Sequence, residues 1–153
     1  MDGERGHVMV KSACRFDDLS DKDKKTVAYT SNVLLGLPFD STAEESAIEQ
    51  NEVEQYIKDA YDQAKEGDRQ LVAFKGGHIE KDVLKKLGIP YVNIELFGCP
   101  KFEKLTNLGY KLIPNCEHHR KRRDVRFHCA KVECVAFFDW IKDQISSVSQ
   151  RGA

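Results

Sequence analysis

The chain has 153 residues, of which 41% are hydrophobic and 32% are charged, a length that suits one compact domain with its own core. Its formal net charge of −1, from 24 basic and 25 acidic residues, excludes a strongly basic nucleic-acid-binding chain and an acidic disordered tail at the level of the whole sequence. No apolar run approaches the roughly 20 residues of a membrane helix, and the opening residues MDGERGHVMV lack the apolar stretch of a signal peptide. We therefore expect a cytoplasmic or nuclear protein with no membrane partner.

The first third of the chain offers weak signals followed by one strong helix. Residues 7–13 (HVMVKSA) form a candidate strand, and residues 20–23 resemble a helix capping box. Residues 34–39 (LLGLPF) form an apolar turn broken by glycine and proline. Apolar residues at three- and four-residue spacing then predict a helix over residues 41–67.

The remaining elements alternate between strand and helix. We expect strands over residues 71–74, 90–96 and 110–113, and helices over residues 79–87, 101–107 and 130–148. This alternation indicates an α/β architecture with at least two parallel strands. With no internal repeat and no linker, the sequence predicts a single domain over residues 1–149 and a frayed tail over residues 150–153.

The cysteines and histidines point to a metal site. Five cysteines, an odd number in a chain without a signal peptide, argue against a disulfide framework. Cys116, His119, His128 and Cys129 give the pattern C-x2-H followed by H-C, and zinc prefers four tetrahedral ligands of this kind. Neighbouring residues rarely both face one ion, so either one of His128 and Cys129 binds, or both bind on an irregular backbone. The alternative is a reduced surface loop beside a buried helix cysteine.

The start of the last helix resembles a known catalytic motif. His128-Cys-Ala-Lys-Val-Glu133 is similar to the third motif of the DnaQ-like (DEDDh) 3′–5′ exonucleases. In that family a histidine general base stands five residues before a metal-binding acid. The resemblance therefore implies catalytic roles for His128 and Glu133, together with divalent Mg²⁺ or Mn²⁺ ions held by several carboxylates.

Two further stretches can be aligned with the other motifs of these exonucleases. Residues 71–84 resemble the strand, turn and acid-bearing helix of the second motif, which brings Glu80, or Asp82 as an alternative, to the position of its aspartate. The letters of the first motif, D-x-E, occur at residues 2–4, but no apolar strand precedes them. The catalytic acid set is therefore incomplete, and the first strands of the fold are missing or truncated.

A second resemblance accommodates the zinc ligands. The Maelstrom domain of piRNA-pathway proteins is an RNase H-like relative of these exonucleases with a zinc-binding Glu-Cys-His-Cys set. Glu80, Cys116, His119 and Cys129 occur in this order, and roughly residues 70–140 also resemble mobile-element-derived invertebrate proteins. The resemblance implies an α/β, RNase H-like (DnaQ exonuclease-like) mixed sheet flanked by helices. It also implies a structural Zn²⁺ at these four residues, with His128 as the alternate ligand, and single-stranded RNA binding in small-RNA or transposon silencing.

Basic residues gather in the loop between the two halves of the Cys/His pattern. We predict that the following side chains contact phosphates, together with Lys75 beside its two glycines: Arg120, Lys121, Arg122, Arg123 and Arg126. Each contact to a single strand adds a slope of about −0.7 to the salt dependence of binding. The alternatives are a solvated charged loop and a nuclear-localisation signal.

Three functions follow from these patterns. The first is a zinc-stabilised module that binds single-stranded RNA or DNA. The second is a metal-dependent DEDDh-type 3′–5′ exonuclease, and the third is a protein-interaction module that zinc folds. A sheet without its first strand has an open edge, which also predicts a homodimer through that edge.

Overall fold

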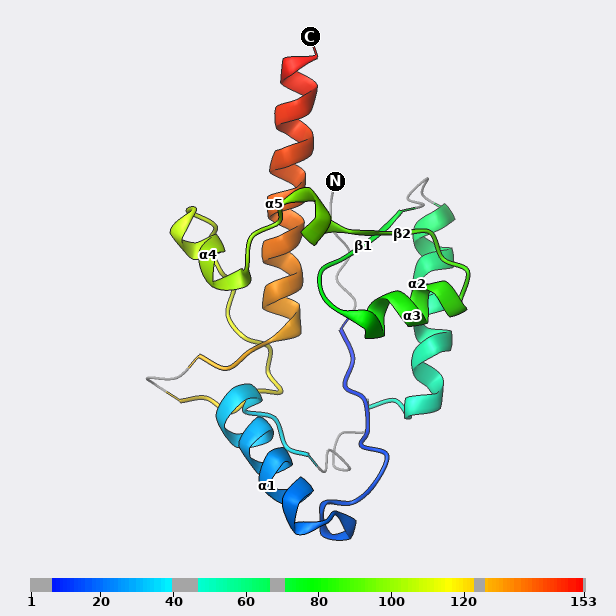
Figure 1. Ribbon diagram of the computed structural model, residues 1–153, viewed down its shortest axis with the longest axis vertical. Coiled ribbons are helices and arrows are strands. Elements are labelled where there is room, and N and C mark those ends of the chain that lie inside the picture. The colour runs from blue at the N-terminus through cyan, green and yellow to red at the C-terminus, as the bar shows by residue number, and fades with distance from the viewer. Residues whose placement is uncertain (1–6, 40–46, 67–70, 123–125, 153) are drawn as a thin grey trace. The chain divides into compact units, whose positions relative to one another are not determined.

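The structure is a computed structural model that describes residues 7–39, 47–66, 71–122 and 126–152 (Figure 1). Of the residues that the structure describes, 57% are helical, and two parallel strands form one small sheet among them. The chain divides into two compact units, and each unit combines two separate stretches of sequence. Unit 1 consists of Met1–Asp18 and Asp40–Gly98, and unit 2 of Leu19–Phe39 and Cys99–Ala153.

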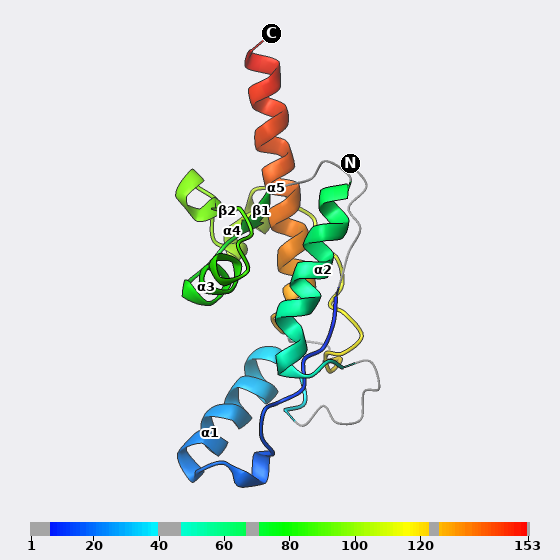
Figure 2. The ribbon, with the colours of Figure 1, turned by 90° about the vertical axis from the view of Figure 1, so that its right-hand side faces the viewer.

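Unit 1 contains a parallel strand pair joined by a helix. In chain order its main elements are α2 (Val53–Glu66), β1 (Val72–Phe74), α3 (His78–Lys86) and β2 (Tyr91–Asn93). The rings of Phe74 and Tyr91 meet edge to face across the strands, with their centroids 5.7 Å apart. Lys86 Nζ lies 2.6 Å from Glu54 Oε1 and links α3 to α2. Figure 2 shows α3 beside the strand pair that it connects.

Unit 2 is helical and has its core at the start of its longest helix. Its helices are α1 (Asp21–Tyr29), α4 (Phe102–Asn107) and α5 (Ala130–Arg151). Val132, Ala136 and Trp140 form the buried stripe of α5 at four-residue spacing. The rings of Phe102 and Phe137 connect α4 to α5, with centroids 6.3 Å apart. None of the described helices combines the length and the apolar character that a membrane span requires.

Half of the predicted capping box before α1 is confirmed, the cap that the Ser20 side chain provides. The Ser20 hydroxyl accepts a hydrogen bond from the Asp23 amide at 3.2 Å and donates one to the Asp23 carboxylate at 2.6 Å. Helix α1 extends from Asp21 to Tyr29, and a π-helical turn follows at Thr30–Leu35. This turn replaces the beginning of the apolar turn expected over residues 34–39.

The expected RNase H-like mixed sheet flanked by helices is wrong for this chain. Within the described ranges, only β1 and β2 form a sheet, and residues 7–13 contribute one isolated bridge, from Val10 to Ile48. Residues 110–113 are not a strand because other groups take their backbone hydrogen bonds. The Tyr110 amide donates to a carbonyl at the end of α4, and the Arg126 guanidinium donates to the Ile113 carbonyl at 2.8 Å.

The local predictions were more accurate than the predicted global fold. The helices expected over residues 79–87, 101–107 and 130–148 are confirmed as α3, α4 and α5. The strands expected over residues 71–74 and 90–96 form the parallel pair β1 and β2, but the second ends at Asn93, where a short 3-10 helix (Ile94–Phe97) begins. Within the described part of the helix predicted over residues 41–67, α2 begins only at Val53, because Ile48 is engaged in the bridge and a capping box starts at Glu49. The first residues of that predicted helix lie outside the described residues, and the single domain stays a prediction.

Gly36 ends the π-helical turn in a left-handed conformation, with φ at +61°. The ring of Phe127, which is 3% exposed, packs directly against its Cα. A Cβ at position 36 would lie 2.6 Å from Phe127 Cε2, closer than real contacts allow. Two constraints therefore require glycine here, the backbone conformation and the packing of Phe127.

We expect Gly36→Ala to lower the free energy of unfolding by roughly 2–5 kcal/mol, since the left-handed conformation costs about 1–2 kcal/mol and overpacking about 1–3 kcal/mol. Gly109→Ala is the matched control in unit 2, because Gly109 has φ at +92° and an added Cβ would meet no neighbour within 4 Å. It should show the backbone cost alone. Urea denaturation followed by circular dichroism measures both variants, and equal losses would contradict the packing contribution of Phe127.

Candidate metal centre

Cys116, His119 and Cys129 form a buried cluster in unit 2. Their potential ligand atoms, two sulfurs and one ring nitrogen, all lie within 4.8 Å of one another. The three residues are 7%, 8% and 2% exposed. Such a set of thiol and imidazole groups, shielded from water, can hold a metal ion.

The Cys116-x2-His119 pair lies on one turn. The His119 amide donates to the Cys116 carbonyl at 3.3 Å, which closes the turn and brings both side chains together. Cys129 comes from the residue just before α5 and accepts a hydrogen bond at its sulfur from the Cys116 amide at 3.5 Å. The cluster therefore joins the turn to the start of α5.

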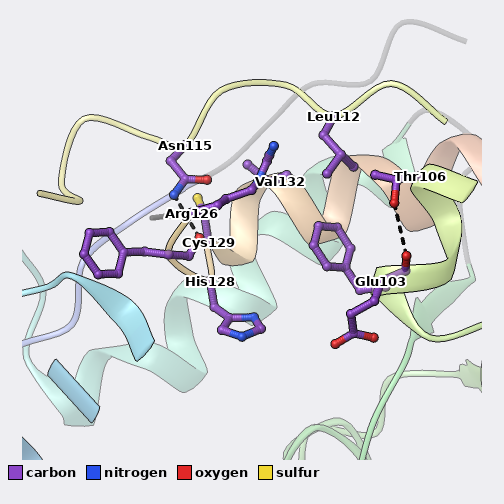
Figure 3. A pocket seen from close by; sticks show the side chains of 10 residues that line it. Glu103, Thr106, Leu112, Asn115, Arg126, His128, Cys129 and Val132 are labelled. Atoms are coloured by element: carbon purple, nitrogen blue, oxygen red, sulfur yellow. Dashed lines mark hydrogen bonds between the residues drawn. The ribbon is translucent and has the colours of Figure 1, made fainter. Parts of the chain in front are cut away.

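The backbone at Cys129 decides which of two neighbouring side chains enters the cluster. Cys129 has extended dihedral angles, φ −129° and ψ 115°, so its side chain and that of His128 point to opposite sides. Figure 3 shows the sulfur of Cys129 and the ring of His128 pointing apart. The His128 side chain is 53% exposed. The structure thus brings Cys129, and not His128, to Cys116 and His119.

A backbone carbonyl orients the His119 ring. His119 Nδ1 lies 2.5 Å from the Leu35 carbonyl oxygen. A carbonyl only accepts, so Nδ1 must carry the proton and donate it. The tautomer then leaves the lone pair on Nε2, which is the arrangement that metal-binding histidines commonly use.

Leu35 belongs to a row of three successive carbonyl groups, residues 34–36, that bind the cluster loop. In order, these carbonyls accept hydrogen bonds from the His128 amide at 3.0 Å, the His119 ring at 2.5 Å and the Arg120 amide at 2.8 Å. The last carbonyls of a helical turn have no partner within the turn. The end of the turn at Thr30–Leu35 therefore supplies acceptors that the loop satisfies.

The two arms of the loop are also connected to each other. Residues 113–116 and 126–129 run side by side and do not form a strand pair. In chain order, the contacts are the Arg126 guanidinium to the Ile113 carbonyl at 2.8 Å, the Asn115 amide to the Phe127 carbonyl at 2.9 Å, and the Cys116 amide to the Cys129 sulfur at 3.5 Å. These three hydrogen bonds hold the ligands in place from both arms.

The two thiols of the cluster differ in their acidity. Burial raises the pKa of Cys116, and the neighbouring Cys129 sulfur adds to that rise. Burial alone would also raise the pKa of Cys129, but hydrogen bonds from the Cys116, Val132 and Lys131 amides and from the Cys116 thiol outweigh it and lower that pKa. Cys129 precedes the first turn of α5, where amide groups favour a negative charge. Of the pair, Cys129 is therefore the preferred thiolate.

Glu80, the predicted fourth ligand, lies in the first turn of α3 in unit 1 and is exposed. Its carboxylate lies over Gly76, where a Cβ would be 3.6 Å from Oε1. Asp82, its alternative, is also exposed on α3. Because the clustered residues belong to unit 2, a ligand role for Glu80 stays a prediction.

The two residues predicted to be catalytic contact each other. His128 Nδ1 lies 3.1 Å from Glu133 Oε1, one turn into α5, and both side chains are partly exposed. A carboxylate that accepts from Nδ1–H leaves Nε2 as the basic nitrogen. The geometry suits a histidine oriented by an acid, and the catalytic assignment itself stays a prediction.

The predicted phosphate-binding cations occupy different settings. Arg120, Lys121 and Arg122 are exposed on the cluster loop, whereas Arg123 lies outside the described residues. Arg126 is exposed and donates to the Ile113 carbonyl. Lys75 in unit 1 has a side chain only 12% exposed, with Nζ 3.9 Å from Glu95 Oε1.

Sequence patterns missed the carbonyls of residues 34–36 and the amide of Asn115. A backbone acceptor leaves no residue-type signature, because every residue has a carbonyl. The glycine and proline of LLGLPF indicated that the chain turns there, but not what the turn binds. Asn115 adjoins Cys116, and its role depends on Phe127, twelve residues away.

Comparison of the chain with protein-family models, with curated proteins and with solved structures found no match.

Two histidines of the same loop test the ligand set. We expect His119→Ala to abolish stoichiometric metal binding and His128→Ala to retain it, because only the His119 ring joins the two sulfurs. Metal content per chain, measured by mass spectrometry on purified protein, gives the answer. Cys134→Ser, an exposed cysteine of α5 outside the cluster, serves as the thiol control. Loss of metal from His128→Ala would contradict this ligand set.

Metal binding near neutral pH should release at least about one proton, because the raised pKa keeps Cys116 protonated in the metal-free protein and a bound ion requires its thiolate. Metal affinity should accordingly fall as the pH is lowered. Calorimetric titrations in buffers of different ionisation enthalpy count the protons. Binding without proton release would show that Cys116 is not a ligand.

Proposed function

We propose that the chain is a zinc-folded module that binds single-stranded nucleic acid, RNA in particular, through the loop that begins at Cys116. The observation that carries the proposal is the position of the exposed cations on that loop. Arg120, Lys121 and Arg122 follow the buried ligand His119 without interruption. One segment thus combines a candidate metal centre with a basic surface.

The ligand types favour zinc among the common metal ions. Thiolate sulfur and imidazole nitrogen are the usual ligands of structural zinc, whereas Mg²⁺ and Ca²⁺ prefer oxygen. Three residues supply two sulfurs and one nitrogen, and zinc takes a fourth ligand. A carboxylate oxygen can complete such a site, and the assignment of this role to Glu80 stays a prediction from the sequence.

Hydrogen bonds of the loop backbone connect the candidate metal centre to the basic surface. The Arg120 amide is bound to the Gly36 carbonyl, and the preceding ring of His119 is bound to the Leu35 carbonyl. A bound ion would fix His119 further and with it the path of the chain through Arg120. Arg120 would then project from a fixed backbone position, which would lower the entropy lost when it binds a phosphate.

Because the overall charge is −1, phosphate binding depends on where these cations lie. Distant charges are screened beyond about 8–10 Å at physiological ionic strength, so a phosphate chain senses the local cluster. Salt dependence should therefore be moderate, with a slope near −0.7 for each phosphate contacted.

The resemblance to the Maelstrom domain supports this proposal through the type and the order of Glu80, Cys116, His119 and Cys129. It lends no support through the RNase H-like sheet, which the described residues do not form. A role in small-RNA or transposon silencing remains the cellular context that this resemblance suggests.

The contact between His128 and Glu133 favours a second candidate, a Mg²⁺- or Mn²⁺-dependent nuclease in which His128 acts as the base. Trimming of 3′ ends that is lost in His128→Ala would support it. A zinc-folded protein-interaction module, the third candidate, would bind no RNA at low salt. The expected homodimer depends on the edge of a larger sheet, and without that premise it stays a prediction.

Replacing Arg120, Lys121 and Arg122 together by alanine should weaken binding to a single-stranded RNA and reduce the salt slope by about 2, the sum of three contacts. The backbone bond from the Arg120 amide survives these substitutions, so metal content should stay unchanged. Fluorescence anisotropy at several salt concentrations measures the affinity and its salt slope, and mass spectrometry measures the metal content.

The matched control replaces three exposed lysines of unit 2 away from the loop, Lys22, Lys25 and Lys142. Its net charge equals that of the loop variant. If the two triple variants bind RNA equally well, the loop is not the binding surface. If the wild-type protein binds dextran sulfate as tightly as RNA, the interaction is that of a general polyanion.

A further inference from the structure

Two of the three clustered residues are cysteines, and they lie on the two arms of the cluster loop. The sulfurs of Cys116 and Cys129 lie within 4.8 Å of each other, in a group that also includes the ring of His119. The Cys116 amide donates to the Cys129 sulfur at 3.5 Å, so the two residues are in direct contact. Among the described residues, the other cysteines of unit 2, Cys99 and Cys134, do not belong to this group. The two sulfurs therefore have two alternative partners, a metal ion or each other.

Neither cysteine lies inside a regular element. Cys116 lies in a stretch without helix or strand, and Cys129 has extended dihedral angles just before α5 begins at Ala130. A disulfide brings two sulfurs into covalent contact, and loop backbone absorbs this shift more readily than a helix or a strand does. The Asn115 amide donates to the Phe127 carbonyl at 2.9 Å, which keeps the two arms together without any contribution from the sulfurs. The pair is therefore placed for a disulfide as well as for a metal ion.

Metal binding and disulfide formation exclude each other at this site. A disulfide uses both sulfurs, so it removes two of the three clustered ligands at once and leaves only the His119 ring. One imidazole does not provide the four tetrahedral ligands that zinc takes. The hydrogen bond from His119 Nδ1 to the Leu35 carbonyl does not involve the sulfurs, so it still attaches the loop to residues 34–36 in the metal-free protein. Oxidation would therefore remove the ion completely and leave a loop that can bind it again.

We propose that Cys116 and Cys129 form a redox switch, in which oxidation by a hydroperoxide joins them in a disulfide, releases the metal and weakens RNA binding. This inference rests on the proposed function and adds a mode of regulation to it. Without the ion, His119 and the path of the chain through Arg120 are less fixed, so the binding of a phosphate costs more backbone entropy.

Hydrogen peroxide is the smallest hydroperoxide, and it suits a pair whose two residues are only 7% and 2% exposed. One sulfur attacks a peroxide oxygen, the O–O bond breaks, and the sulfur becomes a sulfenic acid while the other oxygen leaves as water. The second sulfur attacks the first, the S–O bond breaks, and the hydroxyl group leaves as a second water. The sulfurs together lose the two electrons that the peroxide gains. Two protons from the solvent complete the water molecules, and the site releases its Zn²⁺ without a change in the oxidation state of the ion.

The test uses the full chain, purified and loaded with zinc, before and after treatment with hydrogen peroxide. A chelating dye should register the release of about one zinc ion per chain, and mass spectrometry of the digested protein should find the peptide of Cys116 linked to that of Cys129. Fluorescence anisotropy should show roughly tenfold weaker binding to a single-stranded RNA, which corresponds to the cost of fixing the backbone of about one residue. Dithiothreitol followed by zinc should restore both the metal content and the affinity.

The double variant Cys14→Ser with Cys134→Ser is the matched control, because both cysteines are exposed and lie outside the cluster. It should release zinc and form the same disulfide as the wild type, since the switch needs neither of these thiols. If the double variant keeps its zinc under peroxide while the wild type loses it, oxidation of the exposed cysteines removes the metal, and the proposed switch is wrong.

The measurements separate a failure of the switch from a failure of the proposed function. Zinc that stays bound under peroxide, or that leaves without a link between Cys116 and Cys129, overturns the switch and leaves RNA binding intact. Unchanged RNA affinity after disulfide formation and zinc release also overturns it. Failure of the untreated protein to bind zinc, or to bind RNA at low salt, overturns the proposed function and the switch with it. The wild-type measurement needs no variant, so it is decisive even if the double variant does not fold.

Discussion

The carbonyl groups of residues 34–36 accept three hydrogen bonds from the loop that carries Cys116, His119 and Cys129, and unit 2 is organised around this contact. The left-handed backbone of Gly36 ends the preceding turn, so the carbonyls remain available as acceptors. Phe127 packs on the same glycine and closes the contact from the loop side. The hydrogen bonds of the loop and the packing of Phe127 therefore both depend on residues 34–36.

The contact has a direct effect on the chemistry of the cluster. The Leu35 carbonyl accepts a hydrogen bond from His119 Nδ1, and this bond directs the other ring nitrogen, Nε2, away from Leu35. At the same time, α5 stabilises a negative charge on Cys129, while burial keeps Cys116 neutral. Of the two thiols, Cys129 is therefore the one that loses its proton more readily.

The sequence was most informative where structure is determined locally. Helix α5 and the C-x2-H turn follow from spacing alone, and the Ser20 cap follows from two side chains three residues apart. The prediction of an RNase H-like sheet was wrong in part because residues 110–113 have a strand-like composition but do not pair with another strand. Arg126 and the end of α4 take their backbone hydrogen bonds instead. Strand pairing depends on distant partners that composition does not specify.

The sequence indicated the residue types of the candidate site, but not the groups that hold those residues in place. Adjacent placement of His128 and Cys129 indicated that both would rarely face one ion, and the extended backbone gives the physical reason. The carbonyl that orients His119 has no sequence signature, and neither has the buried oxygen of Asn115. Both arise only when the two arms of the loop and the end of the π-helical turn come together.

The interleaving of the two units has a consequence for how the protein is assembled. His119 and the Leu35 carbonyl are 84 residues apart, and the intervening sequence includes all of Asp40–Gly98 from unit 1. A fragment cut before Cys99 would retain the three clustered ligands yet lose the acceptor that orients one of them. During synthesis, the carbonyl groups of residues 34–36 leave the ribosome long before the loop that donates hydrogen bonds to them has been made. The contact has a high contact order and a large loop-closure entropy, so it belongs to the late steps of folding.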